Sequence, residues 1–351
     1  AADDRPRGAA RCCGLCRRAA PAGPPETVRV RGRCCRWATF ASCSCLLVAG
    51  AAVWLLRSPT RWGQPIDISA RGSVFAKLAG ASYCSANELA TWTCGPKCIS
   101  GVSDVHTCQG DTTKAFVAKW EQRCVVSIMG TQEYTAMVRD LELYKTAASW
   151  QGCNNCNVHA GFLSEWRSLK SCIVGSLENA DCPSGSNIRV TGHSMGGAIT
   201  ALAMTSLADQ GWRIEEGWSF GMPRMGDQLF IEMFNKRFSN VFYRVTHHMD
   251  PVVHVPPATF VTDWHFQHAE PEYFYDGKVG AGYAVCSKDG DVACSGQYSN
   301  VVHDLFHIGD HTEYMDIQIG TPGCNQGWSS GLQDPGQNAS SGAGRGEMLA
   351  V

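Results

Sequence analysis

The residues of this sequence best suited to chemistry are G-H-S-M-G at 192–196, a serine set between two glycines. A strand-like alternation of apolar and polar residues precedes the motif, and a helical stretch without Pro or Gly follows it. A sharp turn from strand to helix lifts a serine hydroxyl clear of the sheet and requires small residues on both sides. It also directs the Met195 N–H toward the point where an oxyanion would form. We therefore predict Ser194 as a nucleophile, with Gly192 and Gly196 as the glycines of the elbow.

A serine hydroxyl becomes a good nucleophile only when a base takes its proton and a carboxylate holds that base in place. On a strand–elbow–helix scaffold the partners follow the serine in the order carboxylate, then histidine. Asp250 is the best-placed carboxylate, because it follows a β-rich run and precedes Pro251, where a strand ends at the edge of a parallel sheet. Asp227 and Asp263 are the alternatives, and any single Asp could instead be a turn or cap residue.

Three histidines near the C-terminus, His303, His307 and His311, could supply the base. Composition does not choose among them, since most histidines lie on surfaces or in cores without a chemical role. His311 lies at the start of a predicted short helix, in G-D-H-T-E-Y at 309–314. A junction of loop and helix suits a base that must reach across to Ser194, so we favour His311.

The elements that must position these residues alternate between strand and helix across 73–324, which predicts one α/β domain. The predicted strands are 116–120, 124–128, 187–191, 216–220 and 241–246, and the predicted helices are 162–177, 198–209 and 227–237. The remaining segments are a basic segment at 1–37, an apolar span at 38–56, a linker at 57–72 and a polar tail at 325–351 that we expect to be disordered.

Charge is unevenly distributed along the chain. Residues 1–61 hold eleven Arg, no Lys and three acidic residues, so with a net charge of −2 overall the remainder is acidic, which argues against nucleic-acid binding. The nineteen residues 38–56 carry no charge and are long enough to cross a bilayer. The arginines before them predict a cytoplasmic N-terminus and a luminal or extracellular catalytic domain in a single-pass membrane protein. The alternative is a cleaved signal peptide and a secreted protein.

Cysteine content also indicates export. Twelve of the nineteen cysteines follow the apolar span, an even number. Cys94-x-x-x-Cys98 and Cys153-x-x-Cys156 lack the second Cys/His pairs that a tetrahedral zinc site needs, so no metal site is predicted. Disulfides formed in an oxidising compartment explain the pattern better.

Several separate blocks of the sequence, in the same order, resemble the class 3 lipases, the fungal triacylglycerol lipase and feruloyl esterase group of α/β-hydrolases. The resemblance covers about residues 75–324. Its blocks are Ser82-Tyr-Cys84, Trp92-Thr-Cys94, Gly130-Thr131, Cys153 through Phe162, the elbow, Phe220 through Gly226, the Asp250 segment, His268 through Phe274, and Asp310 through Tyr314. It implies an α/β-hydrolase fold with a mostly parallel central sheet flanked by helices, preceded here by the predicted transmembrane helix.

The resemblance implies Ser194 as nucleophile, Asp250 as orienting acid and His311 as base. It also implies an oxyanion hole formed by the N–H groups of Thr131 and Met195, with the Thr131 hydroxyl as a further donor. Two positions depart from the family pattern. I-M-G at 128–130 replaces Phe-Arg-Gly, which removes a supporting arginine, and Met195 stands where leucine is usual, a swap that a core tolerates. Neither departure removes a catalytic group.

The disulfides that the resemblance implies are Cys84–Cys324, Cys94–Cys98 and Cys286–Cys294, with Cys153–Cys156 as in the esterase branch. For the other four cysteines, closeness in the sequence favours Cys108–Cys124 and Cys172–Cys182. No cofactor is implied, because the hole, the triad and water suffice for ester hydrolysis. No protein partner is predicted.

Directly after Thr131, apolar residues recur at helical spacing between charged ones. They include Tyr134, Met137, Val138 and Leu141. This predicts a short amphipathic helix where lipases of the family carry a lid that covers the cleft in water and moves at a lipid surface. The alternative is a helix packed permanently on the domain.

Taken together, the sequence predicts a membrane-anchored hydrolase of lipid esters that acts through an acyl-enzyme. A feruloyl-type carbohydrate esterase is the alternative among enzymes. A catalytically silent hydrolase fold that serves as a binding ectodomain is the alternative from another class. The silent fold is disfavoured because all three candidate triad residues are present.

Overall fold

A computed structural model of the chain describes residues 66–131, 134, 144–257, 265–301 and 307–320. All of these residues belong to the unit that begins at Gln64. The segments predicted at 1–37 and 38–56, and the tail at 325–351, lie outside the described residues. Among the helices of the described part, none has both the length and the apolar character needed to cross a membrane.

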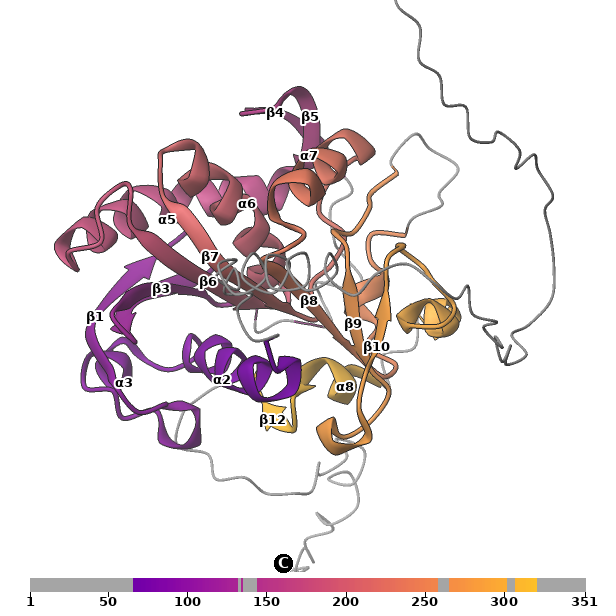
Figure 1. Cartoon of the computed structure of the whole chain (residues 1–351), viewed down its shortest axis with the longest axis horizontal. Helices are drawn as coiled ribbons and strands as arrows, with labels where there is room; N and C mark the ends of the chain where they lie inside the picture. Colours follow the sequence, from indigo (N-terminus) through magenta and orange to yellow (C-terminus); the bar gives the residue numbers. More distant parts are fainter. Residues whose placement is uncertain (1–65, 132–133, 135–143, 258–264, 302–306, 321–351) are drawn as a thin grey trace, which may run out of the picture. The chain divides into compact units, whose positions relative to one another are not determined.

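An eight-stranded sheet in the order β1-β2-β3-β6-β7-β8-β9-β10 forms the centre of the domain (Figure 1). Its strands are β1 Val102–Gln109, β2 Lys114–Trp120, β3 Arg123–Ile128, β6 Asn187–His193, β7 Arg213–Phe220, β8 Phe242–His247, β9 Glu272–Tyr275 and β10 Ala284–Cys286. Neighbours from β3 to β9 are parallel, and the strands at the two margins pair antiparallel. The predicted mostly parallel sheet is therefore confirmed. Because parallel strands end at one edge, the loops after β3, β6, β7 and β8 meet there.

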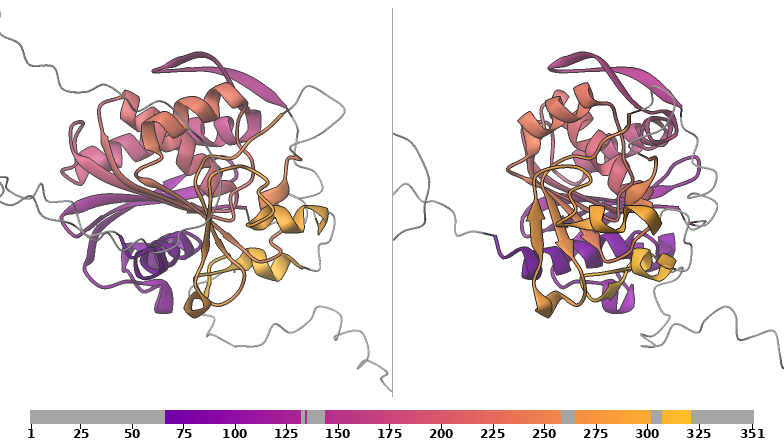
Figure 2. Two further views of the ribbon diagram at one scale, coloured as in Figure 1. Left: turned by 45° about the vertical axis from the view of Figure 1, so that its right-hand side comes forward. Right: turned by 90° about the vertical axis from the view of Figure 1, so that its right-hand side faces the viewer.

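Helices cover both faces of the sheet, as the views of Figures 1 and 2 agree. One face carries α5 (Ala160–Asn179), α6 (Met195–Asp209) and α7 (Gln228–Phe238), and the other carries α2 (Ile68–Ala81), α3 (Ala86–Ala90) and α8 (Ile308–Thr312). Each face has its own apolar core. Helix α6 is buried along most of its length and is rich in Gly and Ala, since it packs against both the sheet and α5.

Smaller elements complete the domain. The hairpin of β4 (Lys145–Trp150) and β5 (Cys153–His159) leads into α5. A second small antiparallel pair, β11 (Glu313–Tyr314) and β12 (Ile317–Gln318), follows α8. The short 3-10 helices are η1 Gly95–Lys97, η2 Val252–His254, η3 Val279–Ala281 and η4 Ser295–Val301.

The linker predicted at 57–72 is wrong at its C-terminal end, because α2 already begins at Ile68. The Asp67 carboxylate caps this helix by accepting the N–H groups of Ser69 and Ala70. Much of its buried face consists of Gly and Ala, so the sequence lacks the periodic large apolar residues that would have marked the helix.

Two disulfides fasten α5 and its C-terminal loop to the sheet, and the pairing expected from closeness in the sequence is wrong. Cys108 on β1 is joined to Cys172 on α5, and Cys124 on β3 is joined to Cys182 beyond that helix. Cys108 and Cys124 cannot meet, because β2 separates their strands and they lie opposite different ends of it, at Ala115 and Lys119. Cys172 and Cys182 cannot meet either, since ten residues of mostly helical chain span about 15 Å and a disulfide needs Cα atoms within about 7 Å.

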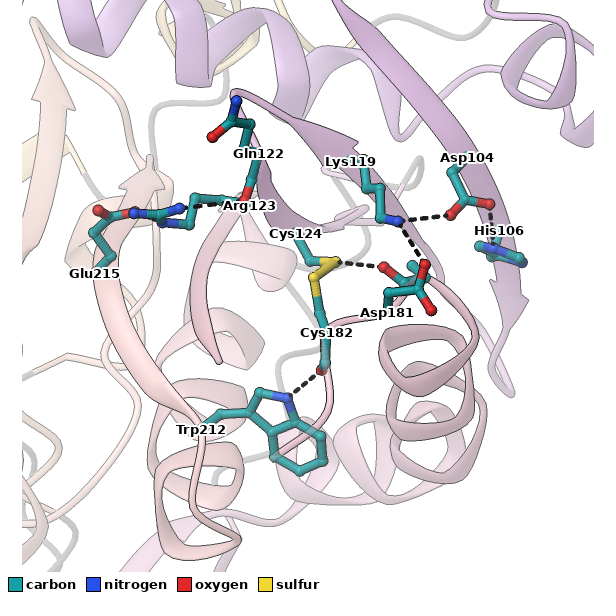
Figure 3. The surroundings of a disulfide bond; sticks show 11 residues. Asp104, His106, Lys119, Gln122, Arg123, Cys124, Asp181, Cys182, Trp212 and Glu215 are labelled. Carbon is teal, nitrogen blue, oxygen red and sulfur yellow. Dashed lines mark hydrogen bonds and ion pairs between the residues drawn. A yellow bond between two sulfur atoms is a disulfide. The ribbon is translucent and has the colours of Figure 1, made fainter. Parts of the chain in front are cut away.

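Figure 3 shows the Cys124–Cys182 bond at the end of the sheet where the parallel strands begin. The Trp212 indole N–H donates to the Cys182 carbonyl at 2.8 Å. Beside it, the Lys119 ammonium lies 3.1 Å from the Asp181 carboxylate and 3.8 Å from that of Asp104. The chain beyond α5 is thus held by a covalent bond, a hydrogen bond and an ion pair.

Three further disulfides join the pairs that the resemblance implied: Cys94–Cys98, Cys153–Cys156 and Cys286–Cys294. Cys84 is also disulfide-bonded. Its expected partner, Cys324, lies outside the described residues.

Candidate active site

Ser194 stands at the turn between β6 and α6 in a backbone conformation that favours glycine, with φ 59° and ψ −132°. A Cβ atom at Gly192 would lie 2.3 Å from the Gly196 carbonyl oxygen, and one at Gly196 would lie 2.3 Å from the Ile128 carbonyl oxygen. Only glycine fits at either position, because backbone on both sides cannot retreat. The turn has the strained conformation that the sequence pattern predicted.

Asp250 and His311 form a fully buried pair at the same edge of the sheet. Asp250 follows β8, and His311 lies in α8. The His311 Nδ1 atom lies 2.9 Å from Oδ2 and 3.0 Å from Oδ1 of the carboxylate. Its Nε2 atom is buried and makes no hydrogen bond to any residue that the structure describes. The imidazole is therefore oriented by the carboxylate on one side and able to accept a proton on the other.

Two more donors hold the Asp250 carboxylate. The Val252 N–H donates to Oδ1 at 2.8 Å, and the Tyr314 hydroxyl donates to Oδ2. Burial raises the pKa of Asp250, but the neighbouring His311 and these hydrogen bonds outweigh it, so the pKa lies below its usual value. The carboxylate stays ionised, as a residue that stabilises a protonated imidazole must. The sequence placed Tyr314 in a family block but suggested no role for it.

The loop after β7 closes around this pair. Gly221 has φ +60°, and a Cβ atom there would lie 2.8 Å from Asp250 Oδ2, 2.9 Å from the Tyr314 hydroxyl and 3.0 Å from His311 Nδ1. The preceding residue, Phe220, accepts the Ser194 N–H at 2.8 Å. One short segment thus contacts both the elbow and the Asp250–His311 pair, which places the three predicted triad residues at one site.

Of the four alternatives considered for the triad, two make other contacts and two lie outside the described residues. The Asp227 carboxylate caps α7 by accepting the Phe230 N–H at 2.9 Å and also binds Asn157. His307 lies 3.6 Å from the Asp310 carboxylate. Asp263 and His303 lie outside the described residues.

A second histidine, His193, links three parts of the site, and sequence reasoning missed it. The Gly130 N–H donates to the Tyr83 hydroxyl at 3.1 Å, and that hydroxyl donates to His193 Nδ1 at 2.7 Å. His193 Nε2 then carries the proton and donates to the His311 carbonyl at 2.7 Å. Burial and the nearby His311 lower the pKa of His193 well below its usual value, so this ring is neutral. Both Tyr83 and His193 occur in the family blocks, which is the signal that could have found them.

The predicted oxyanion residues flank Ser194. A Cβ atom at Gly130 would lie 2.7 Å from the Ser194 Cβ, and Thr131 follows directly. Met195 is the first residue of α6, a helix of 15 residues, so its N–H lies at the positive end of the helix dipole. Donors at these two positions are suited to stabilising negative charge beside the serine.

Only the first residue of the predicted lid helix can be described. The Tyr134 hydroxyl donates to the Gly320 carbonyl at 2.7 Å, and its ring meets that of His311 edge-on at 4.9 Å between centroids. Met137, Val138 and Leu141 lie outside the described residues. A surface cavity is found beside α7, lined by residues that include Lys145, Phe266 and Glu270, and no triad residue contributes to it.

Among the described residues, no group of three or more His, Cys, Asp or Glu side chains could hold a metal ion. The side chains that the site brings together are those of a serine, a histidine and an aspartate.

Comparison with known proteins gives a consistent result. Residues 125–260 match the family described as Lipase (class 3). A secreted mono- and diacylglycerol lipase of Fusarium solani is 32% identical over 148 residues, which are 40% of this chain. The match spans 43% of that relative's length, which is less than half. A lipase of Rhizomucor miehei is 27% identical over 264 residues, 70% of this chain and 68% of that one.

The fold is shared as well. The crystal structure of a mono- and diacylglycerol lipase from Aspergillus oryzae superposes with a TM-score of 0.60 at 21% sequence identity, covering 73% of this chain and 99% of that one. At 21% identity, this structural similarity supports only the α/β-hydrolase fold. Together with the family match over residues 125–260 and the similar lipases, it shows that this chain is similar to the class 3 lipases.

Proposed function

We propose that this protein is a serine hydrolase of carboxylic esters that acts on lipid esters. The observation that carries the proposal is the buried Asp250–His311 pair next to the strained Ser194 elbow in a class 3 lipase domain. The names of the similar proteins, which are lipases of mono- and diacylglycerols, support acylglycerols as the substrate class.

In the proposed reaction, His311 Nε2 takes the Ser194 hydroxyl proton while the oxygen attacks the ester carbonyl. Asp250 holds the His311 Nδ1–H and stabilises the imidazolium. The N–H groups of Thr131 and Met195 receive the oxyanion. Collapse of the tetrahedral intermediate passes the proton from Nε2 to the leaving alcohol and leaves an acyl-serine. Water, activated by the same nitrogen, then releases the carboxylic acid and restores the serine.

A hydrolysis panel on the full chain tests this function. It runs from a short soluble ester through a triacylglycerol emulsion and phospholipid vesicles to methyl ferulate. We expect turnover of acylglycerol esters, which Ser194→Ala and His311→Ala each lower by roughly 10⁴- to 10⁶-fold because triad members act as a unit.

His307→Ala is the matched control, since that histidine lies four residues before His311, and it should retain activity within a few-fold. Loss of activity in His307→Ala with retention in His311→Ala would show that the base is misassigned. Preferred turnover of methyl ferulate would support the esterase alternative, and an inactive wild type would support the silent fold.

We also propose that the domain predicted at 73–324, which begins earlier with α2 at Ile68, is the catalytic domain and that it is exported. The disulfides among the described residues support an oxidising compartment. The apolar span 38–56 would then be either a membrane anchor or a cleaved signal. Sequencing the mature N-terminus separates these, because a start near residue 57 means cleavage and secretion, whereas an intact N-terminus retained in carbonate-washed membranes means an anchor.

A further inference from the structure

The segment that follows Asp250 is held by its carbonyl groups. The Arg224 backbone N–H donates to the Val255 carbonyl at 2.8 Å, and its guanidinium Nη1 donates to the carbonyls of His254 at 2.6 Å and Pro256 at 3.1 Å. The His268 Nε2–H donates to the Val253 carbonyl at 2.7 Å. Two residues thus bind all four consecutive carbonyls from 253 to 256, directly after the proposed triad acid.

Both of these residues are bound in turn by Asp289. Its carboxylate accepts the Arg224 Nε–H at 2.9 Å and the Nη2–H at 3.2 Å, a two-point pair. It also accepts the backbone N–H of His268 at 3.2 Å. The Arg224 and His268 side chains are buried, so water cannot replace the carboxylate easily. A charge-assisted pair with two bonds fixes direction as well as distance.

The ionisation of the groups agrees with this arrangement. Burial raises the pKa of Asp289, but the charge of Arg224 and the hydrogen bonds from its guanidinium outweigh it and hold the pKa well below its usual value. Burial lowers the pKa of His268 to about 3, so its ring is neutral and its Nε2 carries a proton to donate. The carboxylate is therefore charged where Arg224 needs a counterion.

Asp289 is itself fixed to the sheet. It lies in the loop closed by the Cys286–Cys294 disulfide. Cys286 on β10 pairs with Glu272 on β9, and the Ser295 N–H just beyond the loop donates to the Glu272 carboxylate at 3.3 Å. The position of the carboxylate is thus set by the sheet edge and not by the segment that it holds.

We propose that Asp289 is a positioning residue for the triad acid. It touches no reacting atom. It acts through Arg224 and His268 on the segment 253–256, and so on the direction in which the Asp250 carboxylate faces His311 Nδ1. The inference rests on the proposed function, because it takes Asp250 to be the acid that orients the base. Small displacements within such a constellation are costly, since a misplacement of about 1 Å can lower a rate by about 100-fold.

The test compares Asp289→Asn with the wild-type full chain on a short soluble ester. We expect kcat to fall by about 10- to 100-fold with KM within about two-fold, because the variant displaces the carboxylate that orients the base and removes no group proposed to bind the ester. The acid limb of kcat/KM should also move to lower pH, since a displaced carboxylate stabilises the protonated base less. Asp289→Glu, which keeps the charge, should recover part of the lost kcat.

Asp291→Asn is the matched control in the same disulfide loop. Within the part of the chain that the structure describes, its carboxylate accepts only the Ala293 N–H, at 2.9 Å, which an Asn oxygen can also accept. This variant should behave like the wild type. Equal losses in both variants would mean that the loop matters only for general stability and would overturn the proposal.

A second readout does not require turnover. The hydrogen bond to Asp250 deshields the His311 Nδ1 proton, so its low-field NMR resonance should be present in the wild type and shifted or lost in Asp289→Asn. Unchanged kcat, pH profile and resonance, with only a lower Tm, would overturn the positioning role. A wild type that shows the resonance but hydrolyses no ester would contradict the proposed function. The resonance in Asp289→Asn would still test whether Asp289 positions Asp250 against His311.

Discussion

At the amino ends of the parallel strands, buried charges are paired with one another. Glu216 on β7 lies 2.6 Å from Arg71 and 3.4 Å from Arg189, and both guanidinium groups lie over the Trp120 ring. At the carboxyl ends of the same strands, the Asp250 carboxylate instead faces a histidine ring, and within the described residues the second nitrogen of that ring has no hydrogen bond. Paired charges leave no atom ready to react, whereas an oriented nitrogen without a bond can take a proton.

The buried polar residues at the two ends of the parallel strands therefore have different roles. Figure 3 shows part of the amino end, where the Arg123 guanidinium lies 3.4 Å from the Glu215 carboxylate near the Cys124–Cys182 disulfide. These contacts join strands to one another. We expect substitutions at the amino end to change the free energy of unfolding and those at the carboxyl end to change kcat.

Among the substitutions that test this comparison, Gly221→Ala should have the largest effect. The added methyl group would lie within 3.0 Å of Asp250, His311 and the Tyr314 hydroxyl, so the Asp250–His311 pair must separate. We expect kcat on a soluble ester to fall by about 100-fold or more. Gly185→Ala is the matched control, since Gly185 also has a positive φ, +95°, but nothing within 4 Å of a Cβ. It should lose about 1–2 kcal/mol of stability and keep its kcat. A Gly221→Ala enzyme as active as this control would contradict the assigned site.

A smaller effect, on stability alone, is expected for Glu216→Gln. The change leaves Arg71 and Arg189 without the buried carboxylate that they share, which should cost about 3 kcal/mol of unfolding free energy in urea titrations. Glu121→Gln is the control, because Glu121 binds the same two arginines but its side chain is 49% exposed, and it should cost less than about 1 kcal/mol. Both variants should keep kcat within about two-fold. A large loss of kcat in either would show that the two ends are not independent.

The smallest expected effect per residue is a dependence of stability on pH that arises from buried histidines at the carboxyl end. Burial lowers the pKa of His254 to about 4 and that of His268 to about 3, whereas both should titrate near 6.5 in the unfolded chain. As the pH falls below about 6.5 the unfolded chain takes up these protons first, so stability is full above that pH and declines toward pH 4. Each histidine should cost about 1–2 kcal/mol between pH 6.5 and 5.

Urea unfolding at several pH values measures this slope. His254→Gln should make it less steep, because one of the buried neutral histidines is removed, while Glu216→Gln at the other end should keep the wild-type slope. An unfolding free energy that does not change between pH 6.5 and 5 would contradict the assignment.

Strands in the middle of the sheet were predictable and those at its margins were not. The strands predicted at 124–128, 187–191 and 216–220 correspond to β3, β6 and β7, in which most residues are buried. Strand β1 has the sequence VSDVHTCQ with a bulge and is mostly exposed, and β9 has only four residues, so neither carries a strong pattern. Pairing with a neighbour, and not local preference, makes these segments strands.

The sequence by itself determined the elbow, because its requirements are local. A strand, a helix and two glycines within five residues are enough to predict the strained Ser194 backbone. The residue pattern favoured Asp250 and His311 but left other candidates open, since 61 residues separate the two and no short-range pattern links them. The family resemblance implied these two in particular.

Only the tertiary structure decided which distant residues meet. Tyr83 and His193 are 110 residues apart, and Arg224 and Asp289 are 65 apart. The disulfides Cys108–Cys172 and Cys124–Cys182 close separations of 64 and 58 residues, against the pairing that proximity favoured. Contacts of this kind depend on the order of strands in the sheet and on where each loop crosses its edge. The order of the strands and the course of the loops are set by the packing of the whole domain, and they cannot be predicted from short-range patterns of residue type.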